Sequence, residues 1–446
     1  MTSIFSNILT LNFTHLCRNS PGEEFDDFRN GTDEESKKNS DNGKHVSELT
    51  ISIVAMIATF PFSHWCSHHG AKYLFLIAGL FSSVATAFQV VVLEGDWHVS
   101  WLIAVKAAQG LAYAADFAVM GVVCTRWASL SETAIFISAM TCFSPLASIV
   151  TYAASGVICV SPLGWQWISY SHAIFTLFLF LCWAIFYTDA AQDNRFVTHK
   201  ELDIIFDAKT EAHKNRVPFV PYKAIFKSKT VWTVWLNAFA DLFSGYFLIL
   251  YAPNYLGNVL GYDIVNIGFI SAIINTFVIP VKLSSGFLSD CIGVLSNRHK
   301  LWLFNSVALL LPAVCYIIIC YVPTDFPLMT IILFGVISAA IGFNAGGFYK
   351  CGALISRQYA EVVIAFTQFI KCAVFFIAPG LMTIFVPNES EAAQWHPIFY
   401  LISASMIIAN VVFLFYASDQ PRSFTKITAP NRDNVVKGKM TSTSVI

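Results

Sequence analysis

The chain has 446 residues, of which 56% are apolar and only 12% are charged, and its formal net charge is −1. Because soluble globular proteins carry about 25% charged residues, this composition excludes a water-soluble protein and makes the lipid bilayer the expected surroundings. The near-zero net charge gives no basic surface of the kind that binds nucleic acid, so no nucleic acid partner is expected.

Apolar segments long enough to cross a bilayer recur along the chain. A membrane-spanning helix needs about 20 mostly apolar residues, and eleven segments meet this requirement. In chain order they are 47–66, 73–93, 100–123, 134–157, 166–188, 231–256, 264–284, 300–322, 327–350, 358–386 and 397–417. Residues 1–16 are also apolar but shorter, and they lack the basic start and the cleavage site of a signal peptide. They predict a partial first helix.

A polar stretch divides these segments into two groups of six, the partial helix included. Two sets of six helices are typical of transporters that are built from two repeated halves. The predicted fold class is therefore an all-α polytopic membrane protein with a 6+6 helix bundle. The predicted divisions are an N-terminal half at 1–188, a cytoplasmic linker at 189–230, a C-terminal half at 231–417 and a cytoplasmic tail at 418–446.

After residue 46, lysine and arginine residues outside the spans occur only in alternate loops. The basic set comprises the loops with Lys72, Arg126, Arg298, Lys300 and Arg357, the linker and the tail, whereas the short loops between them carry none. The positive-inside rule places the basic set and the C-terminus in the cytoplasm. The acidic loop 18–46 then lies on the opposite side, as do the glycosylation acceptors Asn30 and Asn388. We therefore expect a glycoprotein of the plasma membrane or of an intracellular vesicle membrane.

The cysteines and histidines predict neither an enzyme nor a metal site. The eleven cysteines include no Cys-x-x-Cys pair and mostly lie in or beside apolar segments, so we expect small core residues rather than disulfides or zinc ligands. His64, His68 and His69 have the spacing of one histidine box of membrane di-iron desaturases, but the other histidines stand alone. The chain also lacks a Walker-type loop and a Gly-x-Ser-x-Gly motif.

Four ionisable residues lie deep within predicted spans: Lys106, Asp116, Asp241 and Lys371. Such a residue costs about 2.5–3.5 kcal/mol on insertion and commonly marks a functional site. Lys106 would either contact an anionic solute or form a structural ion pair with Asp241 or Asp116. Asp241 would pair with a cation, titrate with a coupled proton, or neutralise a lysine. Lys371 is a further candidate for solute contact.

Other residues within spans have structural interpretations. Lys282 and Lys350 lie near cytoplasmic ends, where we expect their ammonium groups to reach the lipid headgroups. The glycines of Gly342-Phe343-Asn344-Ala345-Gly346-Gly347 would allow close helix packing or form a gate. Kinks are expected at Pro253, Pro280, Pro312 and Pro379.

Several stretches resemble a known family of transporters. Lys106-Ala107-Ala108-Gln109-Gly110-Leu111 resembles a fourth-helix Arg-x-x-Gln-Gly-Leu motif, and Arg126-Trp127-Ala128 with Glu132 resembles the Arg-Trp-x-Pro-x-Glu-Arg motif after it. Residues 232–261, with Tyr246, resemble a seventh helix, and Gly286, Asp290, Arg298 and Lys300 match the turn after an eighth. Over about residues 47–420 the chain is thus similar to the anion/cation symporter family of the major facilitator superfamily. That family includes sialin, the vesicular glutamate transporters and the sodium/phosphate cotransporters.

The resemblance implies alternating-access transport of a small organic or inorganic anion, with Na⁺, H⁺ or the membrane potential as driving force and no other cofactor. The first, fourth, seventh and tenth helices would line the cavity, and Lys106 and Asp241 lie on two of these. The candidate substrate-binding residues are Lys106, Asp241, Lys371 and Tyr246. The coupling candidates are Asp116 and Asp241, and the gating or turn candidates are Asp290, Arg298, Arg126 and Glu132.

The sequence departs from the family pattern at several positions. The fourth-helix arginine is Lys106, which keeps the charge but loses the planar fork that grips a carboxylate at two points. The acidic residue seven positions later is Tyr113, and Asp116 is the substitute that lies closest to it. The eleventh-helix glycine and asparagine are Ala365 and Gln368. These changes and the short first helix favour an alternative hypothesis, in which the chain is a non-transporting membrane scaffold or sensor.

Overall fold

The computed structural model describes residues 1–18, 33–95, 98–129, 133–206 and 220–427. Every regular element in these ranges is helical, and eleven segments are long and apolar enough to cross a membrane, which confirms the eleven predicted spans. The main helices are α1 (Thr2–Arg18), α2 (Asp33–His69), α3 (Lys72–Glu94), α4 (Val99–Tyr113), α5 (Ala115–Trp127), α6 (Thr133–Thr141), α7 (Phe143–Cys159), α8 (Gln166–Phe186), α12 (Lys229–Asn258), α13 (Ile264–Thr276), α14 (Val278–Cys291), α15 (Asn297–Ile319), α16 (Pro327–Ile341), α17 (Phe348–Ser356), α18 (Ala360–Phe385) and α19 (Ala392–Tyr416).

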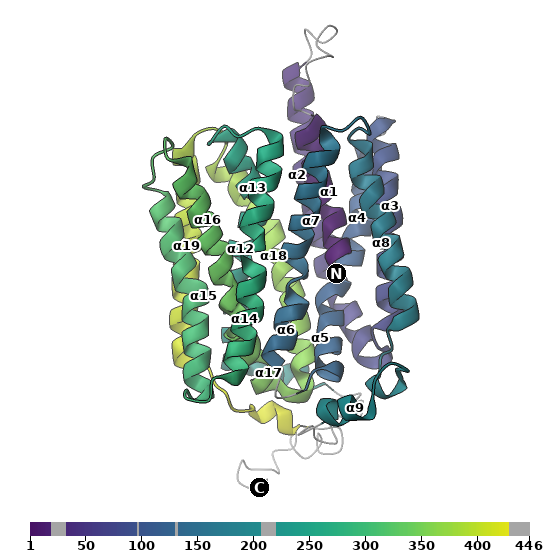
Figure 1. Ribbon diagram of the computed structural model, residues 1–446, viewed down its shortest axis with the longest axis vertical. Helices are drawn as coiled ribbons and strands as arrows, with labels where there is room; N and C mark the ends of the chain where they lie inside the picture. Colours follow the sequence, from purple (N-terminus) through teal and green to yellow (C-terminus); the bar gives the residue numbers. More distant parts are fainter. Residues whose placement is uncertain (19–32, 96–97, 130–132, 207–219, 428–446) are drawn as a thin grey trace.

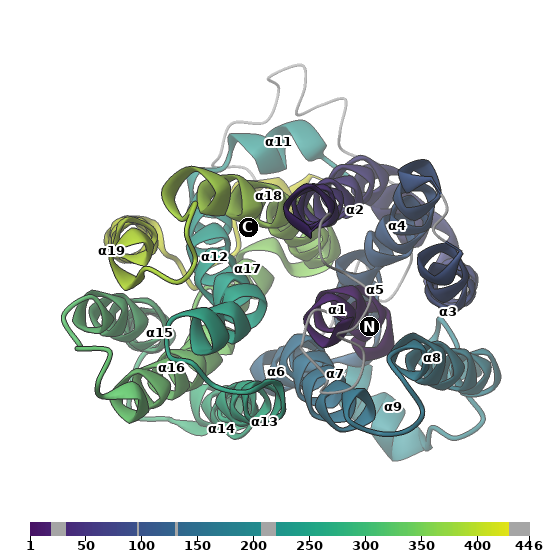
Figure 2. The same cartoon turned by 90° about the horizontal axis from the view of Figure 1, so that it is seen from above.

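The helices form two bundles that lie side by side, α1–α8 in one and α12–α19 in the other (Figure 2). Two seams join them: α18 packs on α2 and α5, and α6 and α7 pack on α14 and α13. The linker between the halves includes two short helices, α9 (His199–Phe206) and α11 (Tyr222–Lys227), and α9 lies at the lower end of the bundle in Figure 1.

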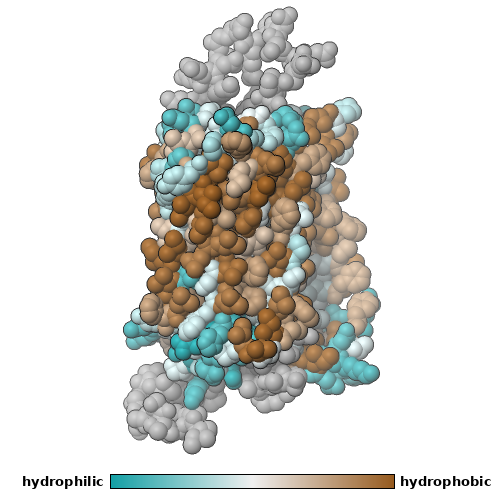
Figure 3. All heavy atoms as spheres, turned by 60° about the vertical axis from the view of Figure 1, so that its left-hand side comes forward, coloured by the Kyte–Doolittle hydropathy of each residue, from teal (hydrophilic) through white to brown (hydrophobic). Residues whose placement is uncertain are grey.

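On the face drawn in Figure 3, apolar residues cover the middle of the molecule and polar residues gather at both ends. Exposed large side chains include Ile57, Ile174, Ile185 and Phe415. Apolar surface on this scale is unfavourable in water but suits contact with lipid tails. The chain is therefore an integral, multi-pass membrane protein.

Helix α1 lies at the centre of the N-terminal half and begins about halfway along it (Figure 1). Its Phe5, Leu9 and Phe13 are fully buried. A disulfide between Cys17 and Cys159 joins the end of α1 to the end of α7, with the two Cα atoms 5.8 Å apart. The expectation that the cysteines only fill the core is wrong for this pair. No local pattern indicated this pair, because 142 residues separate the two positions and only the packing of α1 on α7 brings them together.

Helix α2 begins at Asp33, whereas residues 18–46 were expected to form a loop. Only Leu49–Cys66 of this helix has the hydropathy of a span, so its first turns extend beyond the bundle, as Figure 1 shows. Glutamate and lysine favour helices in water, and hydropathy alone does not detect a polar extension of an apolar helix. Asn30 and the rest of 19–32 lie outside the described residues.

Two spans are interrupted close to a proline. The break between α6 and α7 precedes Pro145, and the break between α13 and α14 precedes Pro280. Proline has no N–H for the carbonyl four residues earlier, and its ring clashes with that carbonyl, here of Thr141 and Thr276. The kink expected at Pro280 is therefore present. A third break, the 3₁₀ turn η2 (Gly342–Ala345), separates α16 from α17.

Candidate functional site

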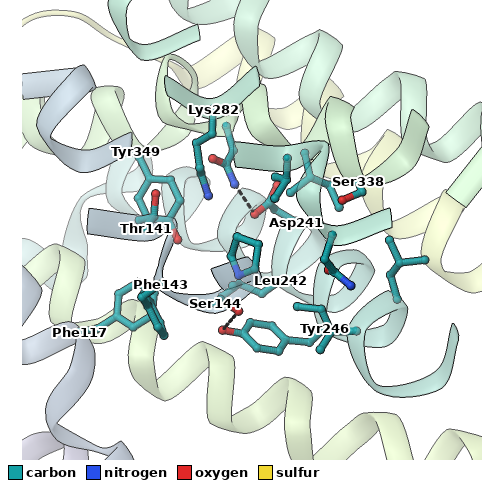
Figure 4. A pocket seen from close by; sticks show the side chains of 18 residues that line it. Phe117, Thr141, Phe143, Ser144, Asp241, Leu242, Tyr246, Lys282, Ser338 and Tyr349 are labelled. Carbon is teal, nitrogen blue, oxygen red and sulfur yellow. Dashed lines mark hydrogen bonds between the residues drawn. The ribbon is translucent and has the colours of Figure 1, made fainter. Parts of the chain in front are cut away.

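A cavity of about 70 Å³ lies between the two halves, beside the three helix breaks. It has room for a few water molecules, each of which needs about 10–15 Å³. Side chains from α5, α6 and α7 of one half and from α12, α14 and α17 of the other form its walls (Figure 4). The two halves that would move relative to each other in transport therefore share this cavity.

Asp241 of α12 is the carboxylate of this cavity and is only 2% exposed. Its Oδ2 accepts a hydrogen bond of 2.9 Å from Asn344 Nδ2, an amide that the η2 turn positions. Its Oδ1 has no hydrogen-bond partner among the described residues. The sequence placed Asp241 on a cavity helix, and the structure places its side chain in the cavity wall.

Lys282 of α14 is the cation of the same cavity (Figure 4). It is 5% exposed, so the expectation that it reaches the lipid headgroups is wrong. Pro280 and the break before α14 place it inside the span, where the charge of Asp241 acts on it. Nothing in the part of the chain that the structure describes forms a hydrogen bond with its ammonium group. This cation is therefore available to a solute.

Tyr246 of α12 connects the two halves across the cavity wall. Its hydroxyl accepts a hydrogen bond of 3.1 Å from Ser144 Oγ of α7, and the side chain is buried. Tyr246 was a candidate for substrate binding, and its position in the cavity is compatible with that role.

Lys371 of α18 lies behind the cavity in a cage of aromatic rings. Its Nζ is 3.9 Å from the ring centre of Tyr113, 4.6 Å from Phe117, 4.8 Å from Phe143 and 5.9 Å from Tyr246. The side chain is fully buried, and its Nζ has no hydrogen-bond partner among the described residues. A desolvated cation over aromatic faces gains about 2 kcal/mol or more, which accounts for a lysine in this apolar place.

Asp116 lies beside a break in the fourth span, between α4 and α5. No proline causes this break. Instead Gln368 of α18 donates a hydrogen bond of 2.8 Å to the backbone carbonyl of Tyr113, so a side chain of the other half satisfies that acceptor. Asp116 is fully buried, neither of its oxygens has a hydrogen-bond partner among the described residues, and its charge acts on Lys371.

Lys106, the strongest candidate from the sequence, lies within the N-terminal half. Its Nζ donates hydrogen bonds of 2.7 Å to Gln89 Oε1 and to Gln109 Oε1. Gln109 in turn donates to Thr86 Oγ1 at 2.9 Å. These bonds join α3 and α4 in a buried polar network, whereas Asp241 lies in the other half. Solute contact by Lys106 remains a prediction, and the geometry supports a structural role.

Asp290 joins the two halves near the end of α14. Its Oδ1 is 2.7 Å from Lys350 Nζ, and its Oδ2 accepts a hydrogen bond of 3.2 Å from the backbone N–H of Ile135 in α6. Lys350 also donates to the carbonyl of Ser289 at 2.9 Å. The expectation that Lys350 reaches the headgroups is therefore wrong, because the nearby carboxylate is a better partner than interfacial water.

The other turn candidates have different partners. Arg126 forms an ion pair of 3.6 Å with Asp189, whose Oδ1 accepts a hydrogen bond of 2.6 Å from the N–H of Ala71. This contact joins the end of α5 to the beginning of the linker. Arg298 is exposed and lies 4.9 Å above the ring of Trp302. Glu132 lies outside the described residues. Asp290 therefore differs from these residues in its contact with α6 of the other half.

Sequence reasoning missed Lys282 and Asn344 as cavity residues. Pro280, two residues before Lys282, was the available signal, because a break in mid-span directs the following side chains into the bundle. The cage around Lys371 had no such signal, since its rings come from α4, α5, α7 and α12. Across the described ranges no three His, Cys, Asp or Glu side chains lie together as a metal site.

Comparisons with known proteins identify similar chains. The family model of the Major Facilitator Superfamily matches residues 49–379. Sialin of Ovis aries is 23% identical over 375 residues, which are 83% of this chain and 74% of sialin. Sodium-dependent phosphate transport protein 1 of Homo sapiens is 25% identical over 332 residues, 74% of this chain and 70% of that protein. A probable small intestine urate exporter of Mus musculus is 24% identical over 385 residues, 84% of this chain and 76% of that protein.

Among solved structures, a bacterial homolog of the human lysosomal transporter Spinster, in an inward-facing and occupied conformation, has a similar fold. The TM-score is 0.60 at 12% sequence identity, and the similarity covers 93% of this chain and 94% of that chain. At this identity the likeness concerns the fold alone.

Proposed function

The chain belongs to the major facilitator superfamily, and from that premise we propose that it is a secondary active transporter of a small organic or inorganic anion. Transport is the activity of the family, and the relatives are transporters rather than enzymes. The finer proposal concerns the solute, its site and the coupled ion. Its main support is Lys282, a buried ammonium group that faces the cavity between the halves.

The charges around the cavity favour an anion. Lys282 lies in the cavity and Lys371 lies behind the aromatic wall of the cavity, and a buried cation attracts an anionic solute. Two of the relatives are named for the handling of phosphate and urate, which are both anions at neutral pH. Lys371 and Tyr246 remain in the proposed site, whereas Lys106 becomes a structural residue.

A coupled cation would balance the charge of the solute. Asp241 and Lys282 carry opposite charges, as do Asp116 and Lys371, and a bound monoanion adds a further negative charge in a region of low dielectric. A proton on Asp116 or Asp241, or a sodium ion beside one of them, would remove that charge. We therefore keep both residues as coupling candidates and propose symport of the anion with H⁺ or Na⁺.

Replacing Lys282 by glutamine is expected to lower kcat/KM for anion uptake at least tenfold, because charge-assisted hydrogen bonds contribute about 1.5–3 kcal/mol. The assay is uptake of labelled phosphate, urate, glutamate or N-acetylneuraminate into proteoliposomes under imposed Na⁺, H⁺ and voltage gradients. Lys200→Gln is the matched control, since it removes an exposed lysine of α9. Equal uptake by Lys282→Gln and wild type would remove Lys282 from the site.

Asn388 provides a test of the proposed orientation. It is exposed in the loop between α18 and α19, and its Oδ1 accepts a hydrogen bond from the N–H of Ser390 in a tight turn. In an orientation with a cytoplasmic C-terminus this loop faces the lumen or the exterior, and glycosidase should reduce the mass of the wild-type protein more than that of Asn388→Gln. Identical mass changes for wild type and Asn388→Gln would contradict glycosylation at Asn388. Asn30→Gln tests the other acceptor in the same way.

A further inference from the structure

Lys371 is a buried cation that aromatic rings from both halves surround. We propose that it is a tethered cation that exchanges between its aromatic cage and the anionic group of the transported solute. Binding of the anion would then release a contact that holds the two halves together. This inference rests on the proposed anion transport and specifies how its binding site works.

The cage is built from both halves of the protein. Lys371 belongs to α18 of the C-terminal half, whereas Tyr113, Phe117 and Phe143 belong to α4, α5 and α7 of the N-terminal half. Their ring centres lie 3.9–4.8 Å from Nζ. The cation–π contacts therefore cross the seam between the halves, and a rocking motion of one half against the other must break them.

The ammonium group has no better partner in its present position. It forms no hydrogen bond with the described residues, and the nearby carboxylate of Asp116 acts on it through its charge. Hydrogen bonds between an ammonium group and a carboxylate or phosphate are about twice as strong as neutral ones. An anion in the cavity thus offers Lys371 charge-assisted hydrogen bonds, which the aromatic rings cannot form.

The distance between the cage and the cavity is short. Phe117, Phe143 and Tyr246 contribute to both, since they surround Lys371 and also line the cavity that contains Lys282. One layer of rings separates the two places. The four-carbon stem of lysine is flexible, so a change of side-chain rotamer together with a rotation of one ring brings the ammonium group into the cavity.

The exchange would couple binding to movement. A ligand changes the balance between two conformations only if it binds them with different affinity. The conformation with Lys371 in the cage lacks one of the cations that the anion needs, and the conformation with Lys371 in the cavity lacks the contacts that hold the seam. The anion therefore favours the second conformation, in which the halves are free to move.

A weaker cage should bind the anion more tightly. Phe117→Leu removes one of the four rings while keeping an apolar side chain, so less free energy opposes the release of Lys371. We expect the Kd for the anion to fall about fivefold. The measurement is equilibrium binding to purified protein, and its probe is whichever of labelled phosphate, urate, glutamate and N-acetylneuraminate the wild type accumulates. A purely structural role for the cage predicts unchanged or weaker binding, and that result would overturn the proposal.

Phe375→Leu is the matched control. Phe375 belongs to the same aromatic cluster, 5.9 Å from Tyr113 and 4.9 Å from Tyr246 between ring centres, but its ring is not one of the four over Lys371. Its substitution is expected to leave the Kd within about twofold of the wild-type value. An equal fall in Kd for both variants would show a general loosening of the cluster and would contradict the exchange.

A second variant tests the lysine directly. Lys371→Ala should lower anion affinity at least tenfold, and added ethylammonium should restore part of it, because a small ammonium ion can take the place of the missing side chain. Ethanol is the neutral control. Wild-type affinity of Lys371→Ala, or a loss that ethylammonium does not reverse, would overturn the proposal. The absence of uptake of every anion by the wild type would instead reject the proposed function itself.

Discussion

Replacing Asp290 by alanine is expected to destabilise the protein by about 3–5 kcal/mol, because it leaves Lys350 as a buried cation without its counter-charge. The two side chains are 11% and 9% exposed, and their charged atoms are 2.7 Å apart. The same substitution removes the acceptor for the N–H of Ile135, and with it a contact between the two halves. Both losses act on the part of the seam where α6 meets α14.

The measurement is the thermal unfolding of the purified protein in detergent. The double variant Asp290→Asn with Lys350→Gln should recover most of the lost stability, since removal of both charges leaves neither one uncompensated. An Asp290→Ala protein that unfolds at the wild-type temperature would show that the ion pair adds nothing to stability. A double variant as unstable as the single one would show that the uncompensated charge of Lys350 is not the cause of the loss.

Gly110→Ala is expected to destabilise the protein by about 1–3 kcal/mol, because the helices that meet there have no room for a side chain. A Cβ atom on Gly110 would lie 2.7 Å from the backbone oxygen and 3.0 Å from the Cα of Ile51. Backbone atoms cannot turn away as a flexible side chain does, so α4 and α2 would have to separate. Gly110 follows Gln109, which holds Lys106, and the separation would disturb that network as well.

Gly380→Ala is the control, and its expected effect on stability is the opposite of that of Gly110→Ala. Gly380 is exposed in α18, and a Cβ atom there would meet nothing within 4 Å. Alanine favours a helix over glycine by about 0.5–1 kcal/mol, so this variant should unfold at or above the wild-type temperature. If both alanine variants had the same stability, the close approach of α2 and α4 at Gly110 would be contradicted.

The sequence predicted the spans because hydropathy over a span is a local property. Each segment had to be apolar over about 20 residues whatever its neighbours were, and all eleven are present. The beginning of α2 at Asp33 was missed for the same reason, since its first turns are polar. The family resemblance was also readable, because its motifs are short stretches such as Gln109-Gly110-Leu111.

The site was predicted less well because it depends on contacts between distant segments. Lys106, Lys282 and Lys371 all appear in the sequence as lysines within apolar segments. Only the packing shows that the first meets two glutamines, the second an open cavity and the third four aromatic rings. The disulfide between Cys17 and Cys159 was missed for the same reason, because only the packing brings the two cysteines together.

The most direct test of the account is gradient-driven uptake by the purified 446-residue chain in proteoliposomes. We predict that wild type and Lys200→Gln accumulate at least one of phosphate, urate, glutamate and N-acetylneuraminate when an inward H⁺ or Na⁺ gradient is imposed, and that Lys282→Gln does so at least tenfold less efficiently. Uptake no greater than in empty liposomes, for every anion and gradient, would contradict anion transport and favour the scaffold alternative.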